Sequence, residues 1–198
     1  MQVRKEMETL SKKMTYAAFR KMEIPEGDTS IYELIHGEVV KRASPNTPHQ
    51  RASMRLIRLL DRYNEAKKAG ELFHAPYDVY FDEENAGIQP DLVFVSNDRK
   101  FVVRENNGIV GAPDLIVEII SKSTIDKDRV IKKDLYEQFG VREYWIVDPR
   151  NRSIEVYLLD NNRYRLFSFA AEEGPINSSV LPEFVMEVNT VFPEEESV

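Results

Sequence analysis

The chain has no cysteine among its 198 residues, and this absence excludes several classes of site at once. Disulfide bonds, zinc sites built from thiolates and cysteine nucleophiles are all ruled out. The sequence also lacks a glycine-rich phosphate loop, a zinc-ligand spacing and a Gly-x-Ser-x-Gly motif. A cytoplasmic location fits a chain without cysteine, and we expect the protein to be cytoplasmic.

Long apolar runs are missing as well. No uninterrupted run approaches the ~18 residues that a transmembrane helix needs, so we expect no membrane partner. The N-terminal sequence MQVRKEMETLSKK has no apolar segment of the kind that marks a secretory signal. The composition, 42% hydrophobic and 31% charged, is typical of a globular chain. We expect a flexible segment at residues 1–13, one domain at 14–190 and an acidic tail at 191–198.

Positive charge is in short supply, since 27 lysines and arginines face 34 aspartates and glutamates and the net charge is −7. This balance argues against tight, nonspecific binding to a nucleic-acid backbone. It does not argue against hydrolysis, because a metal-dependent nuclease gathers carboxylates at its site and the divalent cation restores a positive local field. Phosphodiester chemistry therefore stays open.

The spacing of apolar residues predicts a mixed sheet with helices packed against it, an α+β (mixed α/β) fold. Strands are expected at residues 31–35, 39–41, 72–81, 91–95, 114–120, 144–147, 154–159 and 164–169. A short helix is expected at residues 16–22. A second helix is expected to be capped by Thr47 and closed by Gly70, and a third to start at Ser123 or Thr124. Three apolar residues of the third helix are expected to face inward: Ile131, Leu135 and Phe139.

Two acidic residues occur where acidic residues are usually excluded. Asp91 opens a strand directly after Pro90, and Glu118 lies inside the apolar run LIVEII. A carboxylate in a buried strand is costly unless it is paired, hydrogen-bonded or bound to a cation. Two carboxylates on neighbouring strands would repel each other, and a divalent metal such as Mg²⁺ resolves that repulsion. The alternative is that each acid caps a strand end or pairs with an arginine.

The third helix carries a polar stripe beside its apolar face. Asp128, Lys132 and Tyr136 fall at positions i, i+4 and i+8, so they share one side of a helix. Lys132 can then point toward Glu118, where an ammonium could hold the attacking water and stabilise charge developing on a phosphate. The alternative is an ordinary exposed Asp–Lys pair, the commoner outcome for such a stripe.

Several blocks of the sequence, taken in order, resemble the Uma-type family of bacterial putative restriction endonucleases, which shares the PD-(D/E)xK nuclease core. The blocks are YELIHGE at 32–38, SP at 44–45, His49, QPDLVFV at 89–95, APDLIVEIIS at 112–121, the stripe from Asp128 to Tyr136, and GVREYWIVDP at 140–149. The resemblance runs from about Met14 to about Phe167. It implies a restriction-endonuclease-like core with a mixed central sheet flanked by helices.

The resemblance also implies roles for particular residues. Asp91 and Glu118 would bind the metal, Mg²⁺ or else Mn²⁺, and Glu33 would supply a further carboxylate. The lysine of the PD-(D/E)xK motif usually stands two residues after the acidic residue, and here Ile120 occupies that position. Lys132 would replace this lysine. Four more residues are candidates for accessory roles: His49, Ser121, Asp128 and Tyr136. For His49, a lone histidine in the first turn of its helix, a packing role is the alternative.

These residues lead to three hypotheses about function. The first is metal-dependent hydrolysis of DNA by an endonuclease. The second is a binding module for nucleic acid or protein that kept the fold and lost turnover, and the third is a hydrolase of RNA or of a nucleotide. Cutting both strands of a duplex needs two sites, so a homodimer is expected, with the hairpin at residues 154–169 as a contact surface.

Overall fold

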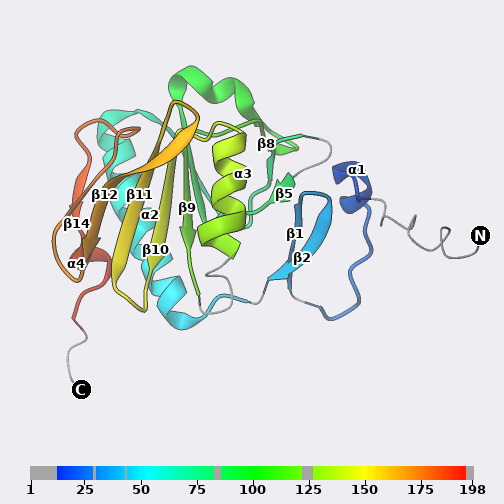
Figure 1. Ribbon diagram of the computed structural model, residues 1–198, viewed down its shortest axis with the longest axis horizontal. Helices are drawn as coiled ribbons and strands as arrows, with labels where there is room; N and C mark the ends of the chain where they lie inside the picture. The colour runs from blue at the N-terminus through cyan, green and yellow to red at the C-terminus, as the bar shows by residue number, and fades with distance from the viewer. Residues whose placement is uncertain (1–12, 29, 43, 83–85, 122–126, 195–198) are drawn as a thin grey trace, which may run out of the picture.

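The computed structural model describes residues 13–28, 30–42, 44–82, 86–121 and 127–194. Two six-stranded sheets dominate these residues (Figure 1). The main sheet has the order β12-β11-β10-β9-β6-β3, and the second sheet has the order β2-β1-β5-β4-β8-β7. The main sheet consists of β3 (Gly70–His74), β6 (Leu92–Ser96), β9 (Leu115–Ile119), β10 (Glu143–Asp148), β11 (Ser153–Asp160) and β12 (Arg163–Ala171).

The remaining elements are shorter or lie against these sheets. The second sheet consists of β1 (Ile31–Ile35), β2 (Glu38–Arg42), β4 (Val79–Tyr80), β5 (Ala86–Ile88), β7 (Val103–Arg104) and β8 (Gly108–Val110). A separate antiparallel pair is formed by β13 (Pro175–Asn177) and β14 (Val185–Glu187). The α-helices are α1 (Tyr16–Phe19), α2 (Thr47–Lys67), α3 (Lys133–Gln138) and α4 (Val188–Val191), with a 3₁₀-helix at Asn97–Val102 and a π-helix at Lys127–Lys132. The expected fold class, mixed sheet with flanking helices, is confirmed.

β9 lies inside the main sheet and is buried on both faces. It pairs with β10 in parallel and with β6 in antiparallel orientation, and all five of its residues are buried. Side chains alternate across a strand. Leu115, Val117 and Ile119 accordingly pack on the face covered by α2. Ile116 packs on the opposite face, with α3, and Glu118 shares that face by the same alternation.

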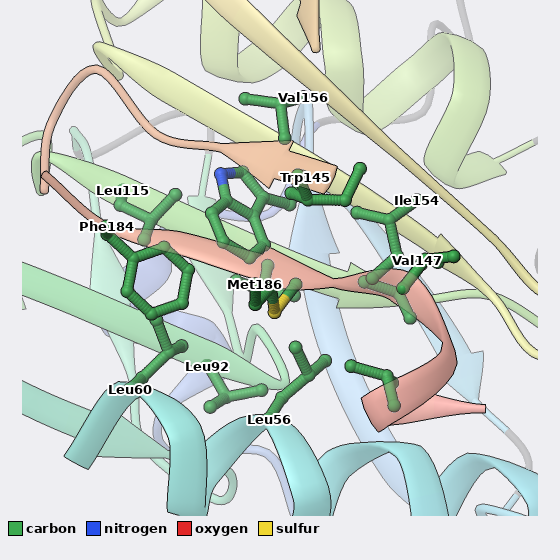
Figure 2. Close-up of a cluster of buried hydrophobic side chains, with 14 of the residues drawn as sticks. Leu56, Leu60, Leu92, Leu115, Trp145, Val147, Ile154, Val156, Phe184 and Met186 are labelled. Atoms are coloured by element: carbon green, nitrogen blue, oxygen red, sulfur yellow. The ribbon is translucent and has the colours of Figure 1, made fainter. Parts of the chain in front are cut away.

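The larger core lies between the main sheet and α2. Leu56 and Leu60 of α2 project toward Leu92, Trp145 and Phe184, as Figure 2 shows. These side chains are almost fully removed from solvent. Burying each large apolar side chain stabilises the fold by roughly 2–3 kcal/mol. This packing holds β6 and β9, and with them Asp91 and Glu118, in one fixed register.

The end points of α2 differ from the expected ones. The cap is Asn46 rather than Thr47, because the Asn46 side chain accepts a hydrogen bond from the His49 backbone N–H at 3.0 Å. Thr47 instead begins the helix. At the other end Lys68 adopts a left-handed conformation with φ of 53°, and Gly70 already starts β3. The asparagine cap fixes the first turn of α2, where His49 lies.

The strand expected at residues 72–81 is also corrected. It divides into β3 of the main sheet and β4 of the second sheet, with Pro76 between them. A proline has no backbone N–H to donate to a ladder, so it interrupts strand pairing. The first helix is shorter than expected, since α1 ends at Phe19 and buries none of its residues.

The third helix follows the expected position, and its expected inward face is confirmed at Leu135 and Phe139 but wrong at Ile131. Its first described turn is the π-helix, whose wider turn rotates later residues relative to an α-helix. Ile131, expected inside, is therefore 44% exposed, whereas Leu135 is fully buried and Phe139 partly buried. The expected start at residue 123 or 124 lies outside the described residues.

The C-terminal part of the described chain packs into the core. Val191 and Phe192, at the start of the expected acidic tail, are buried against α2 and the main sheet. Residues 1–12 and 195–198 lie outside the described ranges. Within those ranges no helix is long and apolar enough to cross a membrane.

Candidate active site

Buried charged side chains gather where the two sheets meet the π-helix. We call these six residues the carboxylate cluster: Glu33, Arg42, Asp91, Glu118, Asp128 and Lys132. β1 and β2 supply the first two, β9 supplies Glu118, and Asp91 directly precedes β6. Each member is at most 6% exposed. Burial of so many charges requires that they neutralise one another or a bound ion.

Asp91 and Glu118 lie side by side. β6 and β9 pair Leu92 with Val117, and one further step of this antiparallel register sets Asp91 opposite Glu118. The Ile119 N–H donates to Asp91 Oδ2 at 2.7 Å, which fixes that carboxylate against β9. Asp91 Oδ1 and Glu118 Oε2 lie 3.6 and 3.7 Å from the same nitrogen, Arg42 Nη2. The two carboxylates thus face one common cation.

Lys132 is buried among carboxylates rather than exposed on a helix surface. Its Nζ donates to Glu118 Oε1 at 2.8 Å and to Glu33 Oε1 at 2.9 Å, and its side chain has no exposed surface. Asp128 Oδ1 is 3.8 Å from the same ammonium and is almost fully buried. The interpretation as a solvated Asp–Lys pair is therefore wrong, because the π-helix turns both side chains inward.

Two of the accessory candidates contact the acids directly. The Tyr136 hydroxyl donates to Glu118 Oε1 at 2.7 Å. His49 Nε2 donates to Asp91 Oδ2 at 3.1 Å, from the turn that the Asn46 cap fixes. Ser121 is partly buried two residues past the end of β9.

Arg42 is the member of the cluster that the sequence did not single out. Its Nη1 donates to Glu33 Oε1 at 3.3 Å and to the Gln89 carbonyl at 3.1 Å. The local sequence VVKRA is typical of a partly exposed strand in which a basic residue is unremarkable. One signal in the sequence could have indicated its burial. Side chains alternate along a strand, so Arg42 lies on the same face as the partly buried Val40 and on the face opposite the exposed Lys41.

A family model covers most of the chain that builds this site. The Uma2 family model, described as "Putative restriction endonuclease", matches residues 16–189. The chain belongs to the Uma2 family. The resemblance seen in the sequence is thereby confirmed, and the family description supports a nuclease.

One solved structure shares this fold over most of its length. A putative nuclease of DUF820 from Anabaena variabilis matches with a TM-score of 0.68 and 18% identity, over 90% of this chain and 97% of that one. At that identity the match shows the shared fold. The type IIG restriction endonuclease BpuSI matches with a TM-score of 0.36 and 15% identity, over 62% of this chain and 13% of that one, which is too distant to support an argument. A search of curated proteins gives no significant match.

The carboxylates of this Uma2 site differ in their pKa values. Burial raises the pKa of Glu118 to about 7, although Lys132 and Arg42 act to lower it. Burial also acts to raise the pKa of Glu33, but there the Lys132 and Arg42 charges prevail and the pKa is lowered. For Asp91, the hydrogen bond from His49 and the Arg42 charge likewise outweigh burial and lower the pKa. Glu33 and Asp91 are thus ionised at neutral pH, while Glu118 titrates there.

This difference predicts how the stability of the metal-free protein depends on pH. The pKa of Glu118 is raised from 4.5 to about 7, so its contribution to stability is complete below pH 4.5 and is lost as pH rises through 7. The free energy of unfolding in chelator should therefore fall between about pH 5 and pH 8, on the order of 1–3 kcal/mol. Urea titrations at several pH values measure it.

The matched control for the pH prediction is Glu118→Gln, which cannot titrate. The free energy of unfolding of this variant should change much less between about pH 5 and pH 8 than that of the parent. The contributions of Glu33 and Asp91 have the opposite sign and are lost only at acid pH, so they do not mask the effect. Identical slopes in the parent and in Glu118→Gln would contradict the assigned pKa.

The donor set of the cluster fits a hard divalent cation. Glu118 Oε2 and Glu33 Oε2 are buried oxygens without a hydrogen-bond partner. Carboxylate oxygens are the ligands that Mg²⁺ and Mn²⁺ prefer, and Mg²⁺ usually takes one or two of them and keeps several waters. Across the described ranges, no group of three or more histidines, cysteines, aspartates and glutamates is placed so that it could hold a metal ion. A metal at this site would take its carboxylate ligands from Asp91 and Glu118, and water would complete its shell.

Proposed function

We propose that this Uma2 protein is a divalent-metal-dependent endonuclease that hydrolyses phosphodiester bonds in DNA. The observation that carries the proposal is the placement of Lys132 Nζ on Glu118, the carboxylate that lies beside Asp91. A lysine next to two acids on adjacent strands can stabilise the charge that develops during metal-assisted attack on a phosphate. The family description supports the nuclease, and the DNA substrate and the metal are the parts proposed here.

Each residue has a distinct role in this proposal. Asp91 and Glu118 would hold Mg²⁺ or Mn²⁺, which when bound lowers the pKa of a coordinated water and polarises the phosphate. Lys132 holds the attacking water and stabilises the charge that develops on the phosphate. Glu33 accepts from Lys132 and orients it.

The accessory side chains act through these groups. Tyr136 donates to the same Glu118 oxygen as Lys132 and so fixes the rotation of that carboxylate. His49 fixes Asp91 in the same way, through Oδ2. Ile120, where the motif lysine is usual, is 3% exposed and packs in the apolar core on the α3 face, so it offers no charge to the site. Lys132 therefore supplies the ammonium from another element.

Nicking of supercoiled plasmid tests the proposal. We expect weak cleavage with Mg²⁺ or Mn²⁺ and none with chelator. Cleavage should be weak because the net charge of −7 disfavours binding to the phosphate backbone. RNA and a nucleotide diester run in parallel distinguish the other hydrolase functions. Failure to cleave every substrate with every metal would contradict hydrolysis and favour a binding module.

We propose a homodimer through the exposed apolar side chains of β12. This strand is the last one of the main sheet, and it exposes three large apolar side chains: Leu166, Phe167 and Phe169. Exposed apolar residues gathered on an edge strand are typical of a contact surface. Light scattering at micromolar concentration should give twice the monomer mass of 23.0 kDa. Phe169→Asp should shift the mass to the monomer, and a monomeric parent would contradict the proposal.

A further inference from the structure

Arg42 contacts the carboxylates through its two terminal nitrogens in different ways. Nη1 makes both hydrogen bonds already described, to Glu33 and to the Gln89 carbonyl. Nη2 lies 3.6 Å from Asp91 Oδ1 and 3.7 Å from Glu118 Oε2, which are charge contacts beyond hydrogen-bond length. The side chain is only 7% exposed, so these contacts form in a region of low dielectric constant.

The two oxygens that face Nη2 are also the two that a metal would use. Asp91 Oδ2 is committed to Ile119 N–H and His49 Nε2. Glu118 Oε1 is committed to Lys132 Nζ and the Tyr136 hydroxyl. Each carboxylate therefore has one oxygen held by the protein and one oxygen turned toward Arg42, and Glu118 Oε2 accepts no hydrogen bond at all.

We propose that Arg42 and the divalent metal are alternative counter-ions of this oxygen pair, so that Arg42 must withdraw Nη2 when the metal binds. The inference rests on the proposed metal-dependent function. Asp91 Oδ1 and Glu118 Oε2 would hold the metal with the same lone pairs that they now turn toward Nη2. Two cations held by the same buried oxygen pair would repel each other strongly, because the dielectric constant there is low.

The geometry allows this exchange at small cost. Nη2 loses charge contacts and no hydrogen bond, while Nη1 keeps its anchor on Glu33 and Gln89. Arg42 therefore lowers the affinity for metal by holding the oxygen pair until a metal displaces it. Removing the guanidinium should raise that affinity, whereas removing an ordinary structural arginine would not.

Mn²⁺ binding to the full-length protein, measured by electron paramagnetic resonance, tests the inference without relying on activity. We expect Arg42→Met to bind Mn²⁺ about tenfold more tightly than the parent, if Arg42 leaves the oxygen pair open about a tenth of the time. Arg58→Met is the matched control, because Arg58 is an exposed arginine of α2 and its loss changes the net charge equally. Its Mn²⁺ affinity should equal that of the parent.

Thermal unfolding gives a second readout. Arg42→Met leaves buried carboxylates with less compensation, so its Tm in chelator should fall by about 10 °C. Saturating Mn²⁺ should restore most of that loss and should raise the Tm of Arg42→Met more than that of the parent. If the single variant does not fold, Glu33→Gln/Arg42→Met removes one acid together with the arginine, and it should bind Mn²⁺ more tightly than Glu33→Gln alone.

The outcomes separate the inference from the proposed function. Equal or weaker Mn²⁺ binding by the Arg42 variants, with clear binding by the parent, would overturn the inference and leave the metal-dependent nuclease in place. No Mn²⁺ binding by the parent or by any Arg42 variant would overturn both. Tighter binding by the Arg42 variants, with Arg58→Met unchanged, is the result that the inference requires.

Discussion

Replacing Asp91 with asparagine is expected to lower metal-dependent DNA cleavage by about three orders of magnitude or more, because one of two carboxylate ligands is lost. The asparagine carbonyl can take the place of Oδ2 and still accept from Ile119 and His49. The amide nitrogen then takes the place of Oδ1 and cannot bind a hard cation. The variant therefore removes the metal ligand while keeping the local hydrogen bonds. Plasmid nicking with Mg²⁺ and Mn²⁺ measures the effect.

Two controls make the Asp91 result interpretable. Circular dichroism and Tm should show a folded variant. Asp91→Asn protein, purified by the same procedure as the parent, should show no cleavage above that of a reaction without protein. Cleavage at the parental rate by this variant would mean that the activity comes from a contaminant, and the assignment of Asp91 would then have no support.

Replacing Lys132 with methionine is expected to affect both activity and stability. Cleavage should fall by about 10²–10³-fold, the usual effect of removing one preorganised donor from a charged transition state. Breaking a buried ion pair by removing one partner costs about 3–5 kcal/mol, so the variant should also be less stable. Methionine is preferred to alanine because it fills most of the volume that the buried lysine occupies.

The neighbouring Lys133 supplies the matched control for Lys132. Its ammonium lies 3.5 Å from the centre of the Tyr157 ring, away from the carboxylate cluster. Lys133→Met should therefore retain parental cleavage, and Lys132→Met should still bind Mn²⁺ through Asp91 and Glu118. Parental cleavage by a folded Lys132→Met protein would show that the lysine has no part in hydrolysis.

Much of the cluster could be predicted because its residues break local rules. Glu118 is an acid inside an apolar strand, and Asp91 is an acid at the start of another. Such residues are costly unless a partner is present, so each one indicates a site from its sequence context alone. Lys132 and Tyr136 could be grouped by helical spacing, and both indeed contact Glu118.

Other features could not be predicted because they depend on long-range packing. Arg42 breaks no local rule, and only the meeting of β2 with the ends of β6 and β9 shows that its guanidinium is buried. The division of residues 72–81 between two sheets also depends on which strands are available for pairing. The exposure of Ile131 could not be predicted for a local reason, because this residue lies in a π-helix, which does not follow α-helical spacing.

Diffraction from crystals soaked in Mn²⁺, with data collected at the manganese edge, tests the central claim most directly. We predict an anomalous peak about 2 Å from Asp91 Oδ1 and Glu118 Oε2, with Arg42 Nη2 displaced from the position that it holds beside both oxygens. A fully soaked crystal with no peak at this pair of oxygens, or with the metal bound elsewhere on the chain, would contradict the assignment of the site.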